Sequence, residues 1–345
     1  MVTPAPPSRI SGVMFILLTL AGWSSVPLFL KHFTGYFDAW TANGWRYLLS
    51  ALVWLPVLIV QHARGTLLPG LWRASALPAL FNTLGQVFFS LAFYYLDPGL
   101  MTFVFRAHIV FMMLGAYVLF PAERPLLRRP AYWAGLGAVL AGSVGTIFLG
   151  AAPPSGATAA GIVIVIISGV CFAAYWLGVR ACLHDTHPVT GFAAISQYSA
   201  VGMVLLMLVF GERCGARGLE LTASQFALVF ASSLAGIALG HVFYFAALNR
   251  LGVVVASGIV QLQPFAVTAA SYAIFGERLT AAQWCSGGVA VAGAILMLRV
   301  RGRAEPAAAS PANDPHPVDA GESLVPESAL LETETEMQRT EDRGA

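Results

Sequence analysis

Ten apolar runs, each close to 20 residues long, account for most of this 345-residue chain. About 20 apolar residues is the length that an α-helix needs to cross the hydrocarbon core of a bilayer. Turn residues such as Asp97-Pro98-Gly99 and Pro121 separate neighbouring runs. We therefore predict an all-α integral membrane protein with ten transmembrane helices. The predicted spans are 11–30, 40–60, 75–96, 99–120, 131–150, 158–180, 191–211, 225–248, 252–275 and 281–299.

Charged residues are too few for a water-facing surface. They make up 10 % of the chain, against 57 % hydrophobic residues, whereas a soluble domain carries about a quarter charged residues. Ten of the 17 acidic residues lie after position 304, so the first 300 positions hold only seven carboxylates. Residues 301–345 are rich in Ala, Pro, Glu and Ser, and we expect a disordered acidic cytoplasmic tail there.

The positions of the basic residues predict the orientation in the membrane. With the N-terminus in the cytoplasm, eleven basic residues fall on the inner side and four on the outer side. Both termini are then cytoplasmic, and residues 1–10 form a short N-terminal segment. A cleaved signal peptide is the competing interpretation of residues 9–30, but the apolar part is long and no A-x-A site follows it. We expect a multi-pass protein of a bacterial cytoplasmic (inner) membrane.

An internal repeat divides the membrane part into two halves. At an offset of 155 residues, Leu-Gly-Gln-Val-Phe-Phe at 84–89 matches Leu-Gly-His-Val-Phe-Tyr at 239–244. The offset, with short gaps towards the end, also pairs Leu96 with Leu251, Tyr117 with Tyr272, Phe120 with Phe275, Glu123-Arg124 with Glu277-Arg278, and Gly137 and Gly142 with Gly288 and Gly293. We therefore predict one five-helix repeat at 11–150 and a second at 158–299.

Five spans per repeat have a geometric consequence. An odd number of crossings returns the chain to the opposite side of the membrane, so the second copy is expected to be inserted upside down. Inverted repeats recur in secondary transporters, because two pseudo-symmetric halves can exchange conformations around one central site. A channel or a membrane enzyme has less need of this arrangement.

The repeated residues resemble the EamA-like family of the drug/metabolite transporter (DMT) superfamily over residues 11–299. The motifs that carry the resemblance are Phe120 to Arg124, Phe275 to Arg278, Gln263-Pro264-Phe265, Trp23-Ser24 and Trp45-Arg46-Tyr47. The resemblance implies two inverted five-helix repeats around a central cavity, and export of amino acids, other metabolites or drugs. This chain departs from the pattern at Ile109, where the family usually has a proline matching Pro264.

Polar side chains within the spans are the candidate substrate-binding residues, since a buried polar group in a membrane is costly. No Asp or Glu lies well inside any predicted span, so a histidine would have to carry protons if protons drive transport. The repeat pairs several of these polar positions, which places them at mirrored depths around one cavity. The candidates are Trp23, Gln86, Arg106, His108, His241, Tyr244, Gln261 and Gln263.

Arg106 is the strongest candidate. Without a buried carboxylate to neutralise it, its guanidinium can offer two parallel N–H donors to a substrate carboxylate or phosphate. The alternative is that Arg106 binds backbone carbonyls or extends to the membrane surface. For Arg46 a structural role between helices is favoured, and for the Glu-Arg pairs a role in capping loops and stabilising one conformation. His108 and His241 either titrate, giving proton coupling, or act as neutral hydrogen-bond donors.

Small residues favour close helix packing, either within the bundle or in a homodimer. They are Gly137, Ala141 and Gly145, with Gly288 and Ala292 in the second repeat. Nothing in the sequence predicts a cofactor, a metal site or a nucleic-acid partner; the expected partners are the lipid bilayer and a small-molecule substrate.

The leading hypothesis is a secondary transporter that exports a small anionic or zwitterionic metabolite, such as an amino acid. An exporter of hydrophobic or cationic drugs is the alternative, in which the aromatic residues dominate recognition. From a different class, a passive channel or membrane scaffold is disfavoured by the repeat. An enzyme is not expected, because the chain has no H-E-x-x-H, G-x-S-x-G or Walker A motif.

Overall fold

The computed structural model describes residues 9–302 apart from 122–123, 125–127, 151–154, 185, 252–255 and 257–258, and all of these belong to one compact unit. The helices are α1 (Arg9–Phe33), α2 (Ala39–Ala63), α3 (Leu71–Ala92), α4 (Pro98–Phe105), α5 (His108–Leu119), α6 (Pro130–Phe148), α7 (Gly156–Cys182), α8 (Pro188–Phe210), α9 (Ala223–Ser232), α10 (Gly240–Leu251), α12 (Gln263–Phe275) and α13 (Ala281–Gly302), with the 3₁₀ segment η2 (Glu212–Glu220) and the π-helical segment η3 (Ser233–Leu239). The first two positions of the predicted tail, 301 and 302, form the end of α13. Residues 303–345 and the first eight residues lie outside the described residues.

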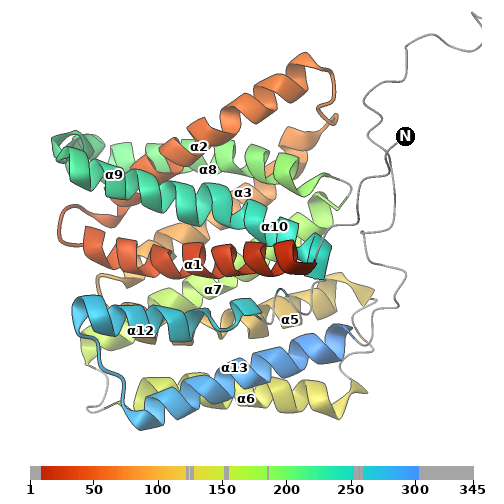
Figure 1. Ribbon diagram of the computed structural model, residues 1–345, viewed down its shortest axis with the longest axis vertical. Helices are drawn as coiled ribbons and strands as arrows, with labels where there is room; N and C mark the ends of the chain where they lie inside the picture. Colours follow the sequence, from red (N-terminus) through yellow and green to blue (C-terminus); the bar gives the residue numbers. More distant parts are fainter. Residues whose placement is uncertain are drawn as a thin grey trace, which may run out of the picture. The chain divides into compact units, whose positions relative to one another are not determined.

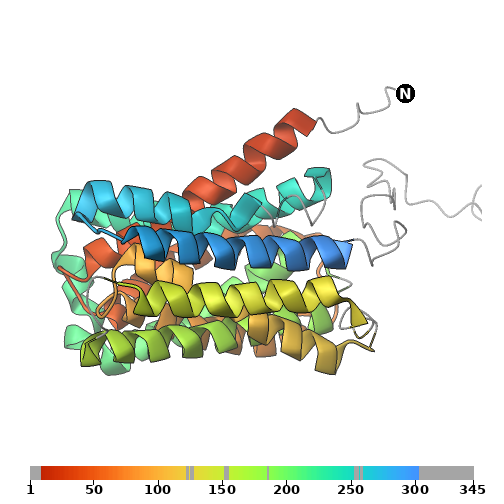
Figure 2. The same ribbon diagram turned by 90° about the horizontal axis from the view of Figure 1, so that it is seen from below.

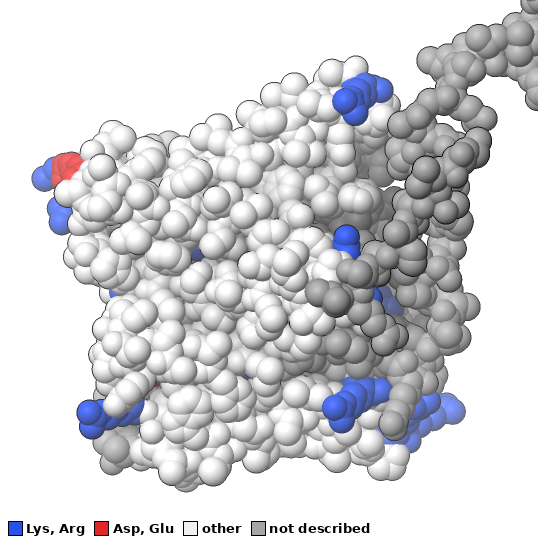
Figure 3. All heavy atoms as spheres, viewed as in Figure 1, with Lys and Arg blue, Asp and Glu red and all other residues white. Residues whose placement is uncertain are grey.

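The helices run side by side along a common direction (Figures 1 and 2). Within the described residues, nine helical stretches are long and apolar enough to cross a membrane. Lys and Arg side chains gather at the two ends of the helices, and a broad face almost without charge lies between them (Figure 3). This distribution is that of a multi-pass membrane protein. For the tenth predicted span, 252–275, the structure describes mainly α12, whose 13 residues are too few to cross alone.

Polar caps fix where several of the helices begin. The Asp38 carboxylate accepts hydrogen bonds from the N–H groups of Trp40 and Thr41 before α2. Ser155 caps α7, and Thr222 forms a reciprocal capping box with Gln225 at the start of α9. Such caps satisfy N–H groups that have no partner inside the helix, which fixes the residue at which each of these helices begins.

Packing between the two repeats is reciprocal. The first helix of each repeat packs on the third helix of the other, so that α1 lies on α10 and α7 lies on α3. The second helices, α2 and α8, contact each other, as do the last helices, α6 and α13. Segments of the two fourth spans, α4 and α12, also pack together. The α1–α10 and α7–α3 contacts are equivalent through the repeat, and the α2–α8 and α6–α13 contacts each join equivalent helices of the two repeats.

Glycines bring α6 and α13 into close contact, but in a different register from the one predicted. A Cβ at Gly142 would lie 2.4 Å from the backbone nitrogen of Ala290, and one at Gly293 would lie 2.6 Å from the carbonyl oxygen of Gly135. Gly137, in contrast, has open space around it, and Ala141 is exposed. Of the predicted residues of α6, Gly145 does lie against α13, at Ser286, whereas Gly137 and Ala141 do not. The contact face is turned towards Gly135 and Gly142, which the sequence could not distinguish from the other glycines of α6.

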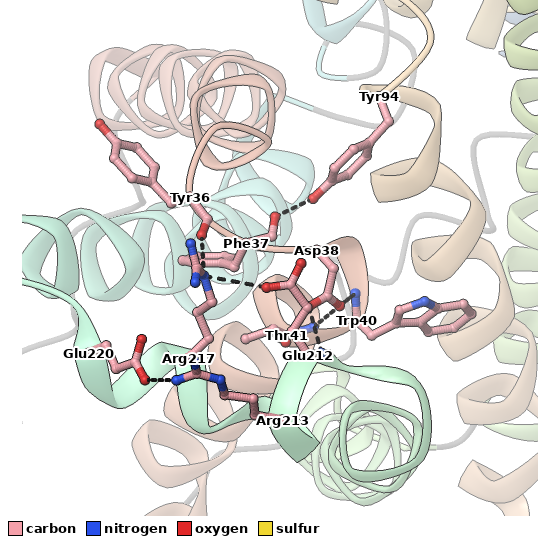
Figure 4. A network of polar contacts seen from close by, with 10 residues as sticks. All are labelled: Tyr36, Phe37, Asp38, Trp40, Thr41, Tyr94, Glu212, Arg213, Arg217 and Glu220. Carbon is pink, nitrogen blue, oxygen red and sulfur yellow. Dashed lines mark hydrogen bonds and ion pairs between the residues drawn. The ribbon is translucent and has the colours of Figure 1, made fainter.

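Loops at one end of the bundle are joined by polar contacts, shown in Figure 4. We call this the η2 end. The Asp38 carboxylate accepts from the backbone N–H of Glu212 at 3.0 Å, and Tyr94 donates its hydroxyl hydrogen to the carbonyl of Phe37. Arg217 donates to the carbonyl of Tyr36 at 3.1 Å. The Asp38 and Arg217 bonds connect the α1–α2 loop of the first repeat to η2 of the second, and the Tyr94 bond joins the α1–α2 loop to the loop before α4.

Candidate functional site

Both fourth spans are interrupted at repeat-equivalent positions. In the first repeat, α4 ends at Phe105 and α5 begins at His108, so the span predicted as continuous at 99–120 is broken. Short-range bonds mark the break, from the N–H of Ala107 to the carbonyl of Val104 and from Val110 to Ala107. Their equivalents 155 residues later run from Leu262 to Ile259 and from Phe265 to Leu262. The two breaks therefore share one backbone geometry, of the tight 3₁₀ type.

The breaks lie deep within the bundle. The eight residues of α4 rise about 12 Å and the 13 of α12 about 20 Å from the η2 end. A hydrocarbon core is about 30 Å thick, so the breaks lie near its middle. In the first repeat the break forms without the proline that Pro264 supplies in the second, where the proline stands in the first turn of α12.

Arg106 joins the two breaks. Its Nη1 donates to Oε1 of Gln261 at 3.0 Å and its Nη2 to Oε1 of Gln263 at 2.7 Å. The Nε2 of Gln263 in turn donates to the carbonyl of Trp23 in α1 at 2.8 Å. We call Arg106, Gln261, Gln263 and Trp23 the Arg106 network. Arg106 thus neither extends to the membrane surface nor depends on backbone carbonyls, which were the alternatives that the sequence left open.

The charge of Arg106 has no described counter-charge. The side chain is only 4 % exposed, and its Nε is buried without a hydrogen-bond partner. Gln261 and Gln263 are neutral, so they orient the guanidinium without cancelling its charge. A buried cation held in this way is costly unless an anion joins it. The arrangement is therefore suited to binding a carboxylate or a phosphate.

An aromatic cluster adjoins the Arg106 network through Trp23. The ring of Trp23 contacts His241 at 5.5 Å and Tyr244 at 5.0 Å between centroids. His241 is stacked on Phe192 at 4.1 Å and lies 6.3 Å from Trp176. These five side chains, Trp23, Trp176, Phe192, His241 and Tyr244, form what we call the aromatic cluster. It offers ring faces to an apolar, aromatic or cationic group.

The two histidines have well-defined surroundings. Nδ1 of His241 lies 3.1 Å from the carbonyl of Ile237, and Nδ1 of His108 lies 2.7 Å from that of Phe105. A carbonyl oxygen can only accept a hydrogen bond, so Nδ1 carries the hydrogen in both rings. His108 is also stacked on the ring of Phe105 at 4.6 Å.

The structure does not bring all eight predicted residues into direct contact. Trp23, Arg106, His241, Tyr244, Gln261 and Gln263 are connected through the Arg106 network and the aromatic cluster. His108 follows Arg106 in the chain, but its ring packs on Phe105. Gln86 is half-buried in α3, and its backbone carbonyl accepts a hydrogen bond from the side-chain amide of Asn43. Among the described contacts, its side chain has none to the Arg106 network.

Sequence reasoning missed several neighbours of the site. Phe192 lies in an apolar run of ordinary composition, and nothing in the sequence distinguishes it from a lipid-facing ring. The π-helical turn of η3, which leads directly into His241, also has no sequence signal. Such turns are frequent at functional sites. Arg46 donates from Nε to the Ser232 hydroxyl at 2.9 Å, a contact between α2 and α9, and its Nη1 is buried without a hydrogen-bond partner.

The described residues were also compared with the side-chain groupings that hold metal ions. Three or more His, Cys, Asp or Glu side chains do not gather there in a group that could hold an ion. The site consists instead of one fixed cation, neutral amides and aromatic rings, a set suited to recognition.

Comparison with known proteins identifies the family. A model of the EamA-like transporter family matches the chain twice, over residues 10–148 and 159–299. A crystal structure whose title gives no activity shares the fold, with a TM-score of 0.56 at 17 % sequence identity over 87 % of this chain and all of the other. No curated protein matches the sequence. The two matches agree with the predicted halves, and the chain belongs to the EamA-like transporter family of the drug/metabolite transporter superfamily.

Proposed function

We propose that this membrane transporter exports a small anionic or zwitterionic metabolite, such as an amino acid, and that Arg106 binds the substrate's carboxylate. The observation that carries the proposal is the buried Arg106 guanidinium, held by two neutral amides and with a free Nε. A substrate carboxylate would supply the missing negative charge through charge-assisted hydrogen bonds. The aromatic cluster would then receive the rest of the molecule.

We further propose that the ten spans form two inverted repeats around a central cavity and work by alternating access. The reciprocal packing of the two halves and the paired breaks support this proposal. Broken helices that meet near the membrane midplane are a recurrent feature of transporters built from inverted repeats. The first repeat would occupy 11–150 and the second 158–299. Export as the direction rests on the family resemblance.

The excess of basic residues at one end supports a placement with both termini in the cytoplasm of a bacterial inner membrane. The acidic tail at 301–345 would then lie in the cytoplasm.

Proton coupling of transport would depend on His108 or His241, the two histidines of the candidate site. The described glycine contacts of α6 are made within one chain, to α13.

A second candidate function is export of hydrophobic or cationic drugs, and the aromatic cluster supports it, since ring faces attract cations. A passive channel or membrane scaffold is the alternative function that does not involve a carrier. Counterflow separates these classes, because only a carrier exchanges a labelled substrate outside for an unlabelled one inside.

The proposal is tested with purified protein in proteoliposomes. A thermal-shift screen with L-alanine, L-phenylalanine, L-glutamate, succinate and the cation tetraphenylphosphonium finds ligands, and counterflow follows with those that bind. We expect Arg106→Gln to abolish binding and counterflow of the carboxylates, while Arg73→Gln, a change at an exposed position of α3, leaves both unchanged. Carboxylate transport at the normal rate by Arg106→Gln would refute the role of Arg106. Transport of tetraphenylphosphonium alone would favour the drug exporter.

A further inference from the structure

The segments α4 and α12 are connected at both ends. The end of α4 is joined to the start of α12, since Arg106 donates to Gln261 and Gln263. The start of α4 is joined to the end of α12, since the carboxylate of Glu277 accepts from the N–H groups of Gly99 and Leu100 at 2.8 and 2.9 Å. The two segments therefore lie antiparallel, one from each repeat. Between the ends, Phe103 meets Phe265 edge to face at 5.3 Å.

Two glycines allow the carboxylate of Glu277 to approach the backbone of α4 closely. Gly276, at the end of α12, has a left-handed backbone with φ of 72°, which glycine adopts without strain and which turns the chain directly into Glu277. The Glu277 side chain is 8 % exposed. A Cβ at position 99 would lie 2.7 and 2.9 Å from the two carboxylate oxygens and 2.6 Å from the Thr268 hydroxyl. Only glycine at position 99 lets the carboxylate approach the backbone.

The bonds at this end combine charge with helix geometry. The first N–H groups of a helix lack partners within it and carry partial positive charge, so a carboxylate placed there is stabilised. On the other side of the same turn, Lys31 forms an ion pair with Asp97 at 2.9 Å and donates to the carbonyl of Phe93. The start of α4 is thus bound to α1 of its own repeat, and through Glu277 to the opposite repeat.

We propose that Glu277 is the latch of a gate at the η2 end: its carboxylate holds α4 of the first repeat against α12 of the second, and this end opens only when the carboxylate leaves Gly99 and Leu100. The break at Arg106-Ala107 is the hinge, because the 3₁₀ bonds there separate α4 from α5. This inference rests on the proposed function for its link to the substrate. A carboxylate bound by Arg106 would compete with Gln261 and Gln263, leaving α4 attached to α12 by the latch and by the Phe103–Phe265 contact.

The latch is tested by measuring the distance across it. Spin labels are attached at Tyr95→Cys and Arg278→Cys, both exposed positions on either side of the contact, after the four native cysteines are changed to serine. Electron paramagnetic resonance then gives the distance distribution in lipid nanodiscs. We expect a single short distance with native Glu277, and a main population at longer distance in Glu277→Gln, whose amide group places a donor against a backbone donor.

Three further variants keep the test decisive. Gly99→Ala disrupts the same contact from the other side and is expected to lengthen the distance while keeping the carboxylate. Glu277→Asp, which keeps the charge on a shorter side chain, is expected to retain part of the short population. Glu220→Gln, an exposed change at the same end, is the matched control and should resemble the native protein. Unchanged distributions in both Glu277→Gln and Gly99→Ala would overturn the latch.

This outcome is independent of the substrate test. If the carboxylates fail to bind but the distances change as expected, the proposed function is wrong and the latch stands. If the carboxylates bind through Arg106 but the distances never change, the latch alone is wrong.

Discussion

At the scale of single residues, Arg106 shows how a membrane protein can keep a charge available. A carboxylate beside it would neutralise the guanidinium permanently and compete with any anionic ligand. The amides of Gln261 and Gln263 satisfy two donors instead, and they leave the net charge in place. What matters for binding is therefore that the Arg106 guanidinium is held in a fixed orientation and keeps its positive charge. An arginine paired with a carboxylate would lack this property.

This interpretation predicts the effect of a carboxylate placed next to Arg106. Gln261→Glu keeps the size and the acceptor oxygen of the side chain and adds a negative charge within reach of Nη1. We expect the affinity for the best-binding carboxylate of the screen to fall roughly ten- to hundredfold, the value of a charge-assisted hydrogen bond of about 1.5–3 kcal/mol. Gln61→Glu, in which the altered side chain faces Thr190 instead, is the control for isothermal titration. An unchanged affinity in Gln261→Glu would contradict the model.

Asp38 is a second residue whose charge matters, here for stability. Burial alone would raise the pKa of its carboxyl, but hydrogen bonds from the Thr41 hydroxyl and from the N–H groups of Glu212 and Thr41 lower that pKa below the usual 3.8. A pKa lowered by folding means that the ionised form stabilises the fold. The stabilisation is complete above pH 3.8 and is lost as the pH falls below that value through the lower pKa of the folded state.

Thermal unfolding measured between pH 3 and pH 7 checks this expectation. The midpoint of the native protein should fall on acidification below about pH 4. Asp38→Asn should have a lower midpoint than the native protein at pH 7, and the difference between the two should shrink at the acidic end. Glu220→Asn, an exposed acidic residue of the same end, serves as control. A constant difference across the pH range would show that the charge of Asp38 has no part in stability.

Some residues of the site could be predicted from the sequence, and the reason is the repeat. The offset of 155 pairs Arg106 with Gln261, and the side chains of these two residues are hydrogen-bonded. No such signal exists for Phe192, because its stacking on His241 depends on how α8 and α10 cross. Polar residues in an apolar span are conspicuous, whereas an aromatic residue there is not.

At the scale of elements, the bundle depends on a few close helix contacts. In a membrane, lipid tails are as apolar as leucine, so helices associate through close packing and hydrogen bonds. The contact of α6 with α13 is of this kind, with Gly135, Gly142 and Gly293 against opposite backbone. The last helices of the two repeats are therefore held together where side chains are smallest.

This contact predicts different effects of the same substitution at two glycines of α6. Gly142→Ala places a Cβ 2.4 Å from the backbone nitrogen of Ala290, which cannot move without shifting α13. Overpacking of this kind costs about 1–3 kcal/mol. Gly137→Ala meets open space and should be neutral or slightly stabilising, because alanine is the better helix former. Thermal unfolding of the two purified variants makes the comparison, and equal midpoints would contradict the described register.

The breaks mark the limit of sequence reasoning at this scale. The break before α12 has a proline in the first turn of the following helix, which favours a helix start. The break after α4 has no proline, and the apolar run 99–120 predicted a continuous span. There the tertiary contacts of Arg106 with Gln261 and Gln263 accompany the interruption. Contacts between repeats, which no local pattern encodes, therefore override local helix propensity.

At the scale of the whole molecule, the proposed inversion links topology to mechanism. If the halves are related by a two-fold axis in the membrane plane, each contact that closes one end has a counterpart at the other. Glu277 at the η2 end corresponds through the repeat to Glu123, which lies outside the described residues. The same pairing relates α4, which ends at Phe105 just before Arg106, to the residues preceding Gln261. Two gates and one central site are what alternating access requires.

Two native cysteines test the orientation on which this view depends. Cys182, at the end of α7, and Cys214, in η2, are both exposed, and the single span α8 separates them. They must therefore lie on opposite sides of the membrane, and the distribution of basic residues places Cys214 outside. In variants that keep one of the two cysteines, with the other three native cysteines changed to serine, a membrane-impermeant maleimide should label Cys214 on intact cells. Cys182 should react only in inverted membrane vesicles. Labelling of Cys182 on intact cells with Cys214 protected would reverse the orientation, and labelling of both from one side would exclude α8 as a transmembrane span and, with it, the inverted second repeat.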